Sequence, residues 1–541
     1  MSQNILEAIV EKRREDIKKL GFTMGFSVPE KRLRGEPVPF ISEKGTVLEI
    51  KRASPSKGDI APQLDAALTA KSYAEAGTSA ISVLTESHWF KGNLEDLINV
   101  CQSVDDFSQK NNCRKIAVLR KDFLLEPEEI EIAYRCGADA VLLISRILDT
   151  EKMTVMAKKC QELGMTAFIE LRLAEDIEKL SQVCKSVDKK YLVCGVNARD
   201  LSDFSIDLLT PCRMLGKIKA VLGEDARVIF ESGIRTPQAA QFAGSLGFTG
   251  LLLGEAAARN PEEAKSLVEN FVNAKENESS KAWLNFANLL QKRNDALEEE
   301  KSHCHHGTKR ERPLVKVCGL TKVNDALYAT MGGADFLGFI FWKGTKRNAS
   351  KEVVLQVKEI INEQFTKTCQ DEHIFAAGCD DAAPLLVGVI VDCTSEESRT
   401  AIDLVKKHKL DFLQLHGEKA IREFFADQEL CTLPHYCVVN VSSEKDLELV
   451  EELRMKGEPR ILLDAKTENQ IGGTGTQINS SLLEGLKKKT KLWLAGGISP
   501  ENVSEIIDTL HPELIDVNSG VEKEPGLKDD EKILSLFNEI G

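Results

Sequence analysis

The sequence predicts two (β/α)8 barrels in one chain, and three observations lead to this prediction. First, 541 residues exceed what one hydrophobic core supports. Second, short apolar runs alternate with amphipathic helical stretches along both halves, a pattern typical of parallel strands buried on both faces. Third, each half contains eight such runs, the number that closes a barrel of this kind.

The first half begins with a predicted helix, because Ile5, Leu6, Ile9 and Val10 fall at helical spacing within the first 20 residues. The predicted strands then recur every ~22 to 36 residues, the length of a strand, a loop, a helix and a return. In order, they are TVLEIK, SAISVL, KIAVLR, DAVLLI, TAFIEL, YLVCGV, RVIFES and TGLLLG.

The second half repeats this organisation after a charged stretch that is poor in apolar residues. Its predicted strands are LVKVCG, DFLGFIF, LLVGVIV, DFLQLH, HYCVVN, RILLDA, KLWLAGG and LIDVNSG. The segment TKTCQDEHIFAAGCDDAAP lengthens one interval, and we expect a surface insertion there, near 362–384. We therefore expect a first barrel over 1–257, a helical and charged linker over 258–312, and a second barrel over 313–541.

Composition and charge exclude several classes of protein. A net charge of −14 argues against a nucleic-acid partner, although small anionic substrates remain compatible with a locally positive pocket. We find no run of 18 apolar residues, no signal segment and no lipidation site, so we expect a cytoplasmic protein without a membrane partner. The 14 cysteines are expected to be reduced. The cluster HCHH at 303–306 lacks a second ligand pair, so no metal is predicted.

Polar side chains follow the predicted strands of the first half, where the active site of a barrel lies. Lysines and carboxylates that converge in a dry pocket suit general acid and base chemistry, with pKa values moved toward neutrality. Structural ion pairs would produce a similar set of residues. The residues in question are Glu49, Lys51, Lys121, Asp122, Glu170, Asn197, Arg199 and Glu231.

Turns of small residues late in each half indicate phosphate binding. Glycine lets backbone N–H groups approach an anion, and the loops after strands seven and eight are the usual phosphate position in this fold. A glycine needed only for a turn is the alternative, but the recurrence in both halves favours phosphate. The candidate residues are Ser232, Gly233, Gly254 and Glu255 in the first half, and Gly496, Gly497, Ser519 and Gly520 in the second.

Ordered motifs make the two halves resemble two enzyme families. EIKRASPSKG, LRKDF, IEL, VNARDL and ESGI make residues 1–256 similar to indole-3-glycerol-phosphate synthase. VKVCGLT, QLHG, LLDA, GGTG, LAGGI and DVNSGVE make residues 313–541 similar to phosphoribosylanthranilate isomerase. The resemblance implies a bifunctional enzyme of tryptophan biosynthesis that acts on anionic phosphosugar-anthranilate substrates without a cofactor. The fusion leads us to expect a monomer.

In the first half, the resemblance implies that Lys121 is the general acid of ring closure and Glu170 the base of the following dehydration. Lys51 and Glu49 would complete the pocket. The implied substrate contacts are Asn197, Arg199, Glu231, Phe90 and Phe123, and the implied phosphate ligands are Ser54, Ser232, Gly233, Gly254 and Glu255.

In the second half, the resemblance implies that Cys318 is the base and Asp464 the acid of an Amadori rearrangement. This role requires Cys318 as a thiolate, whereas a cysteine in VKVCG is otherwise a small buried residue. The implied substrate contacts are Arg347, Gln414 and His416. Arg347 ends the sequence Thr-Lys-Arg where the family usually has Ser-Pro-Arg.

Two other interpretations remain open. In the first, only the N-terminal barrel is active, and the C-terminal barrel is a scaffold or a metabolite-binding regulator, as its altered loop and long insertion suggest. In the second, the protein is a phosphosugar aldolase that uses Lys121 or Lys51 as a Schiff base.

Overall fold

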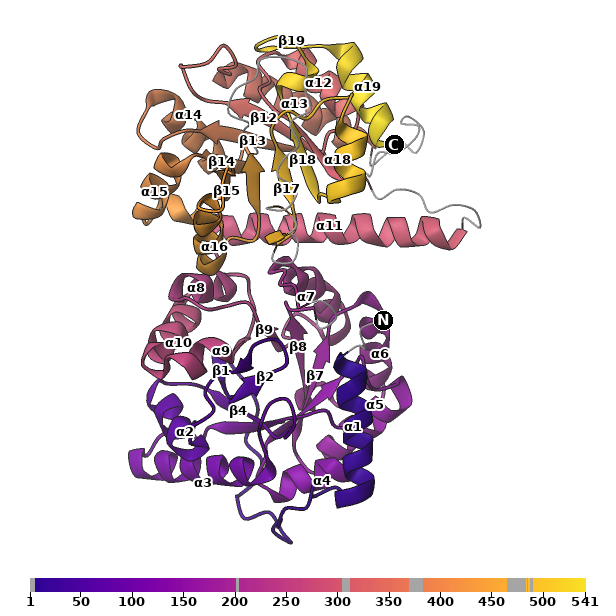
Figure 1. The fold of residues 1–541 in the computed structure, drawn as a ribbon, viewed down its shortest axis with the longest axis vertical. Coiled ribbons are helices and arrows are strands. Elements are labelled where there is room, and N and C mark those ends of the chain that lie inside the picture. The colour runs from indigo at the N-terminus through magenta and orange to yellow at the C-terminus, as the bar shows by residue number, and fades with distance from the viewer. Residues whose placement is uncertain are drawn as a thin grey trace. The chain divides into compact units, whose positions relative to one another are not determined.

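Two closed eight-stranded parallel barrels make up the fold, which confirms the predicted class (Figure 1). The structure is a computed structural model that describes residues 5–200, 204–303, 312–368, 383–464, 483, 485–486 and 490–541. Two compact units divide the chain, one containing residues 1–276 and the other residues 277–454 and 458–541. The GGTG motif at 472–475, residues 304–306 of the HCHH cluster and residues 369–382 of the expected insertion lie outside the described residues.

The first barrel closes because β1 pairs in parallel with both β10 and β4. Its strands coincide with the eight predicted apolar runs, and their residues are almost all buried, as strands covered by helices require. The strands are β1 (Gly45–Ile50), β4 (Ala80–Leu84), β5 (Ala117–Lys121), β6 (Ala140–Ile144), β7 (Thr166–Leu171), β8 (Leu192–Asn197), β9 (Val228–Glu231) and β10 (Gly250–Leu253).

Four of the described helices of the first unit begin at side chains that cap their free N–H groups. Asp65, Asn93, Asp149 and Thr236 each accept a hydrogen bond from the first turn of the helix that follows. The helices are α1 (Ile5–Leu20), α2 (Ala66–Glu75), α3 (Leu94–Asn111), α4 (Glu128–Arg135), α5 (Thr150–Glu162), α6 (Ala174–Cys184), α7 (Leu209–Leu222), α8 (Pro237–Ser245), α9 (Glu255–Arg259) and α10 (Ala264–Asn273).

The second barrel closes in the same way, because β11 pairs with both β12 and β18. Its strands are β11 (Leu314–Val317), β12 (Phe336–Ile340), β13 (Leu385–Ile390), β14 (Phe412–His416), β15 (His435–Asn440), β16 (Ile461–Asp464), β17 (Trp493–Ala495) and β18 (Leu514–Val517). Its helices are α11 (Glu278–His303), α12 (Val323–Met331), α13 (Lys351–Thr368), α14 (Glu396–Lys406), α15 (Glu418–Ala426), α16 (Asp446–Lys456), α18 (Val503–Leu510) and α19 (Asp530–Ile540).

The described part of the interval expected as a linker, residues 258–303 and 312, is mostly helical and divides between the two units. Helix α10 packs on α8 and β1 of the first unit, whereas α11 belongs to the second. On α11, Trp283 and Phe286 are buried, and Trp283 lies 5.3 Å from Phe412 and 6.4 Å from Trp493 between ring centroids. Phe412 and Trp493 begin their strands, so α11 closes the N-terminal end of the second barrel.

We expect the Trp283→Ala substitution to destabilise the second barrel by about 3–5 kcal/mol, the usual cost of truncating a buried aromatic side chain. Scanning calorimetry of the full chain should show the transition of the second unit at lower temperature and that of the first unchanged. Trp342→Ala is the matched control, because Trp342 belongs to the same barrel but is 45% exposed. Equal melting of the two variants would contradict a structural role for α11.

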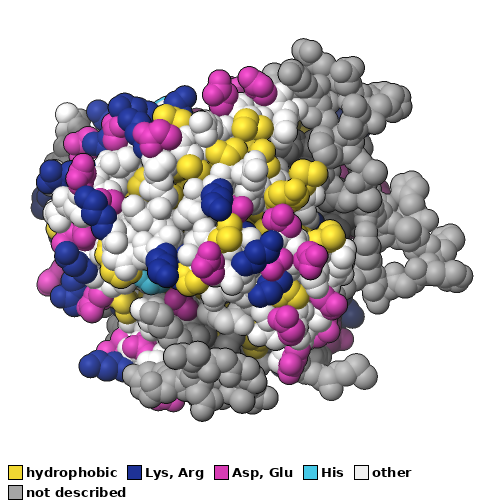
Figure 2. Space-filling model, turned by 90° about the horizontal axis from the view of Figure 1, so that it is seen from above, with side chains coloured by type: hydrophobic (Ala, Val, Ile, Leu, Met, Phe, Trp, Pro, Cys, Tyr) yellow, Lys and Arg dark blue, Asp and Glu magenta, His cyan; other side chains and the backbone are white. Residues whose placement is uncertain are grey.

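The described surface carries many charged side chains, as expected from a chain in which 29% of the residues are charged. Acidic and basic side chains are interspersed over the described part of the face seen in Figure 2. Among the residues that the structure describes, every helix is too short or too polar to cross a membrane. The described cysteines carry free thiols.

Candidate active sites

The first barrel has a pocket at the carboxyl ends of its strands, with an empty volume of about 1200 Å3 that opens to solvent. The structure brings together almost all of the residues predicted for this half. Glu231 is not among the lining residues, but it contacts Lys121 directly behind the wall. The predicted residues that line the pocket are Glu49, Lys51, Ser54, Phe90, Lys121, Asp122, Phe123, Glu170, Asn197, Arg199, Ser232, Gly233, Gly254 and Glu255.

Lys121 lies among carboxylates at the end of β5. Its Nζ is 3.0 Å from Oε2 of Glu231 and 3.4 Å from Oε2 of Glu49. Burial would lower the pKa of Lys121, but Glu231, Glu49 and Glu170 outweigh burial and raise this pKa above its ordinary value. The expected move toward neutrality is therefore wrong for this lysine. Lys121 is held as an ammonium group, the form that can donate a proton.

The pKa of Glu170 is raised as well, and this shift is toward neutrality. Burial, followed by the nearby charge of Glu231, raises its pKa to about 8, although Lys121 and a hydrogen bond with Asn197 act against this shift. Lys121 is thus held protonated, whereas Glu170 gains and loses its proton near pH 8, an arrangement that suits a proton donor and a proton acceptor.

Glu49 and Lys51 leave β1 on one face, as their spacing predicted, and their side chains pair at 3.2 Å. Burial opposes ionisation of Glu49, but Lys51 and Lys121 together lower its pKa. Nζ of Lys51 also lies 5.6 Å from the ring centroid of Phe90, whose ring is 6.0 Å from that of Phe123. The pocket therefore has an aromatic wall beside a cationic group.

Arg199 and Arg235 line the pocket near the small-residue turns. Burial and the charge of Arg235 lower the pKa of Arg199, and an anion bound near both would relieve that repulsion. Ser232 and Gly233 both have positive φ, of 69° and 84°, a conformation that opens the backbone of this turn. Gly254 precedes α9, and a side chain there would come within 2.6 Å of Oε1 of Glu49. These features fit the predicted phosphate position.

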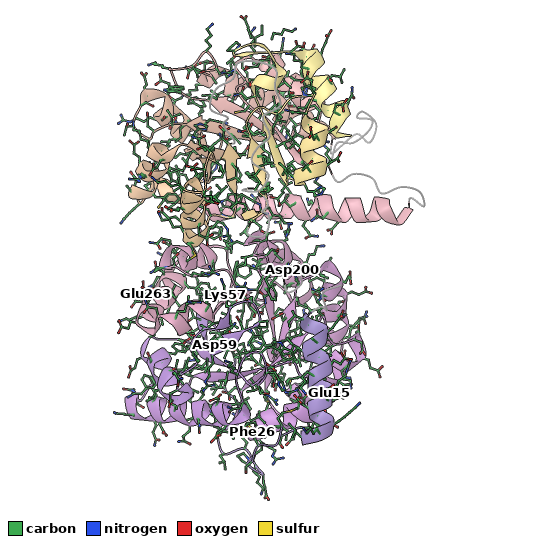
Figure 3. The ribbon with its side chains drawn as sticks, in the orientation of Figure 1. Glu15, Phe26, Lys57, Asp59, Asp200 and Glu263 are labelled. Atoms are coloured by element: carbon green, nitrogen blue, oxygen red, sulfur yellow. The ribbon has the colours of Figure 1, made fainter. Side chains whose placement is uncertain are left out.

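Three arginines that support or line this pocket had no signal in the sequence patterns. Arg13 of α1 is buried, with Nε 3.0 Å from Oε1 of Glu129 and Nη2 3.2 Å from Asp122. These bonds hold α1 against the barrel, and its residues Ile5, Leu6 and Ile9 line the pocket. Arg235 is a further lining residue. Arg172 donates to the backbone oxygens of Asn197 and Arg199 and pairs with Asp200, which is labelled in Figure 3.

The second barrel has its own pocket, with an empty volume of about 820 Å3. It collects residues from each strand from β12 to β18 and from the segments that follow β11, β12, β17 and β18. The predicted residues that line it are Cys318, Arg347, Gln414, His416, Asp464, Gly496, Gly497 and Ser519. Gly520 lies beside it, where a side chain would come within 2.0 Å of the carbonyl oxygen of Ile498.

Cys318 is buried beside a polar network that joins Lys316, Asp516 and Gln414. Nζ of Lys316 lies 3.5 Å from Sγ of Cys318, 2.6 Å from Oδ2 of Asp516 and 2.5 Å from Oε1 of Gln414. Burial raises the pKa of Cys318, although Lys316 acts to lower it. In this state Cys318 is a thiol, and Lys316 is the cation available to stabilise its thiolate.

Comparison with known proteins identifies both halves. The family described as indole-3-glycerol phosphate synthase matches residues 6–269, and that described as N-(5'phosphoribosyl)anthranilate (PRA) isomerase matches residues 315–539. The tryptophan biosynthesis protein TRP1 of Phytophthora nicotianae is 30% identical over 87% of this chain and 86% of its own length. The chain belongs to this bifunctional synthase and isomerase family.

Other relatives agree with the assignment. A multifunctional tryptophan biosynthesis protein of Schizosaccharomyces pombe is 30% identical over 92% of this chain, which spans 60% of that protein's length. An indole-3-glycerol phosphate synthase of Desulforamulus reducens is 33% identical over 49% of this chain and 96% of its own length. The resemblance inferred from the motifs is thus confirmed, with the synthase domain first and the isomerase domain second.

The synthase match ends within α10 and the isomerase match begins at β11. Helix α11 falls between the two matches, although it packs on the isomerase barrel. The isomerase loop with the sequence Thr-Lys-Arg keeps Arg347 in the pocket despite the missing proline. The altered loop therefore does not remove the arginine from the isomerase site.

Proposed function

We propose that this chain catalyses two consecutive steps of tryptophan biosynthesis. The second barrel converts N-(5-phosphoribosyl)anthranilate to 1-(2-carboxyphenylamino)-1-deoxyribulose 5-phosphate, and the first converts this product to indole-3-glycerol phosphate, carbon dioxide and water. The observation that carries the proposal is that each barrel gathers its own candidate acid and base in its own pocket.

In the synthase barrel, Lys121 donates a proton to the ketone oxygen while the carboxylated ring carbon attacks the ketone carbon. Loss of carbon dioxide restores the aromatic ring. The hydroxyl group then departs as water, and Glu170 takes the proton that is lost. Phe90 and Phe123 hold the aromatic ring, and Asn197 orients the substrate. The phosphate binds at Ser54, Ser232, Gly233, Gly254 and Glu255, near Arg199 and Arg235.

In the isomerase barrel, Asp464 protonates the ring oxygen of the furanose, and the bond from that oxygen to C1 breaks to give an imine. Cys318 removes the proton from C2, and the resulting enol becomes the ketone of the product. Lys316 supports the charge of the Cys318 thiolate. Arg347 binds the anthranilate carboxylate. The remaining contacts of the substrate are Gln414, His416, Gly496, Gly497, Ser519 and Gly520.

The test is to supply phosphoribosylanthranilate to the full chain and identify the products over time. The deoxyribulose intermediate should appear and decay while indole-3-glycerol phosphate and carbon dioxide accumulate. Accumulation of the intermediate alone would mean that the synthase barrel is inactive. No consumption of substrate, with turnover of added intermediate, would favour a regulatory second barrel. A covalent adduct trapped by borohydride at Lys121 or Lys51 would favour an aldolase.

The pH dependence of ring closure should follow Glu170. Because its pKa is about 8 in the folded protein, Glu170 is protonated below that pH and cannot accept a proton, so kcat/KM should rise with pH around a midpoint near 8. Glu231→Gln removes a charge that raises this pKa, and its midpoint should lie at lower pH. The exposed Glu224→Gln is the control. A midpoint that stays unchanged in Glu231→Gln would contradict the coupling of the two carboxylates.

We further propose that the protein is a cytoplasmic monomer. The free thiols of the described cysteines support a reducing compartment. Each barrel also has a complete set of strands. Sedimentation at micromolar concentration checks the oligomeric state.

A further inference from the structure

One side of the Arg347 guanidinium is occupied by a carboxylate of the same barrel. Nε of Arg347 lies 2.9 Å from Oε1 and 3.1 Å from Oε2 of Glu522, and Nη2 lies 2.6 Å from Oε2. Glu522 is 6% exposed, and the pair spans 175 positions of sequence. An arginine side chain has several donors in a rigid fork, so binding one edge leaves Nη1 and a second Nη2 hydrogen for another carboxylate.

Glu522 is fixed by the short hairpin that follows β18. Its strands are β19 (Glu522–Glu524) and β20 (Leu527–Lys528), and the backbone N–H of Gly526 donates to Oε1 of Glu522 at 3.1 Å. The turn of this hairpin lies against the Thr-Lys-Arg loop, since a side chain at Gly526 would come within 2.6 Å of the carbonyl oxygen of Lys346. The hairpin thus braces the loop in which the usual proline is missing.

Two cationic side chains among the described residues, Arg347 and Lys528, contact the single carboxylate of Glu522. Nζ of Lys528 lies 3.3 Å from Oε1 of Glu522, and its side chain is 1% exposed. Arg347 and Lys528 therefore share Glu522. Burial outweighs the attraction of Glu522 and lowers the pKa of Lys528. A second anion beside Arg347 would balance the cluster, and the anthranilate carboxylate is such an anion.

We propose that Glu522 is a positioning residue of the isomerase site: it holds the Nε and Nη2 edge of Arg347 so that the remaining edge binds a carboxylate on the aromatic ring of the substrate. This inference rests on the proposed role of Arg347 and adds the group that orients it. Glu522 fixes the Arg347 side chain through the hairpin and not through the loop backbone. It also makes the site selective for rings that carry a carboxylate.

The experiment uses the full chain and two inhibitors of the isomerase step. One is the product with its C2 carbonyl reduced to an alcohol, and the other is the same molecule without the ring carboxylate. Inhibition constants are measured from the disappearance of phosphoribosylanthranilate, which reports on the isomerase site alone. Glu522→Gln keeps the shape of the side chain, and Glu524→Gln is the control, because Glu524 is exposed on the same hairpin.

Glu522→Gln should raise the inhibition constant of the carboxylated inhibitor about ten-fold, the effect of weakening one charge-assisted contact, and leave that of the other unchanged. Glu524→Gln should change neither. An equal rise for both inhibitors would mean that Glu522 only supports the fold and would overturn the proposal. No rise for either would overturn it as well.

Arg347→Met separates this inference from the proposed function. It should weaken only the carboxylated inhibitor, and at least as much as Glu522→Gln does. If it weakens neither, then the assignment of Arg347 to the anthranilate carboxylate is wrong. If Glu522→Gln does not fold, Arg347→Lys tests the same point from the other partner, because an ammonium group cannot bind both carboxylates through two parallel edges. Arg347→Lys should again discriminate between the inhibitors, and equal effects on both would count against the proposal.

Discussion

Replacing Lys121 by methionine is expected to slow ring closure by about 100-fold or more, because a positioned general acid typically contributes at least that factor. The isomerase rate should not change, since Lys121 lies in the other barrel's pocket. The measurement is the conversion of added deoxyribulose intermediate to indole-3-glycerol phosphate. Lys115→Met, at an exposed position of the same unit, should behave as the parent.

Lys121→Arg separates proton donation from charge. Arginine preserves the positive charge beside Glu49 and Glu231 but holds its proton too tightly to serve as an acid. We expect this variant to retain more stability than Lys121→Met and to remain inactive in ring closure. Recovery of the parent rate in Lys121→Arg would show that the site requires a cation and not an acid at this position.

Asp464→Asn and Cys318→Ala are expected to reduce formation of the deoxyribulose intermediate by about 100-fold or more, each through loss of one proton-transfer group. Both variants should still convert added intermediate to indole-3-glycerol phosphate. The matched control for the cysteine is Cys437→Ala, because Cys437 is equally buried in β15 but is not among the lining residues of the pocket. Similar losses in Cys437→Ala and Cys318→Ala would mean that packing, and not chemistry, explains the effect.

The strands and most of the candidate site residues could be predicted because both follow from local patterns in the sequence. An apolar run followed at once by a polar residue locates a strand and its active end, as at Lys121 and Glu170. Each of these residues is positioned mainly by its own strand. Closure of the barrel then brings the strand ends together without further information from the sequence.

The remaining features depend on partners far apart in the chain, for which a single sequence has no periodic signal. Arg13 and Glu129 are separated by 116 positions, and Arg347 and Glu522 by 175. The predicted direction of the pKa shift of Lys121 is wrong for the same reason, since carboxylates from three other strands set this pKa. Helix α11 was expected to be part of a linker because its charged end masks the two aromatic residues that it buries.

Helix α11 is synthesised before the strands of the second barrel that bury its aromatic residues. Trp283 leaves the ribosome 210 residues before Trp493, the partner that covers it. At about 5–20 residues per second, that interval lasts on the order of ten to forty seconds. During this interval the aromatic face of α11 is exposed, because the barrel that it covers has not yet been synthesised. The first domain, which precedes α11 in the chain, can already fold. We therefore expect this helix to be the segment of the growing chain that chaperones engage.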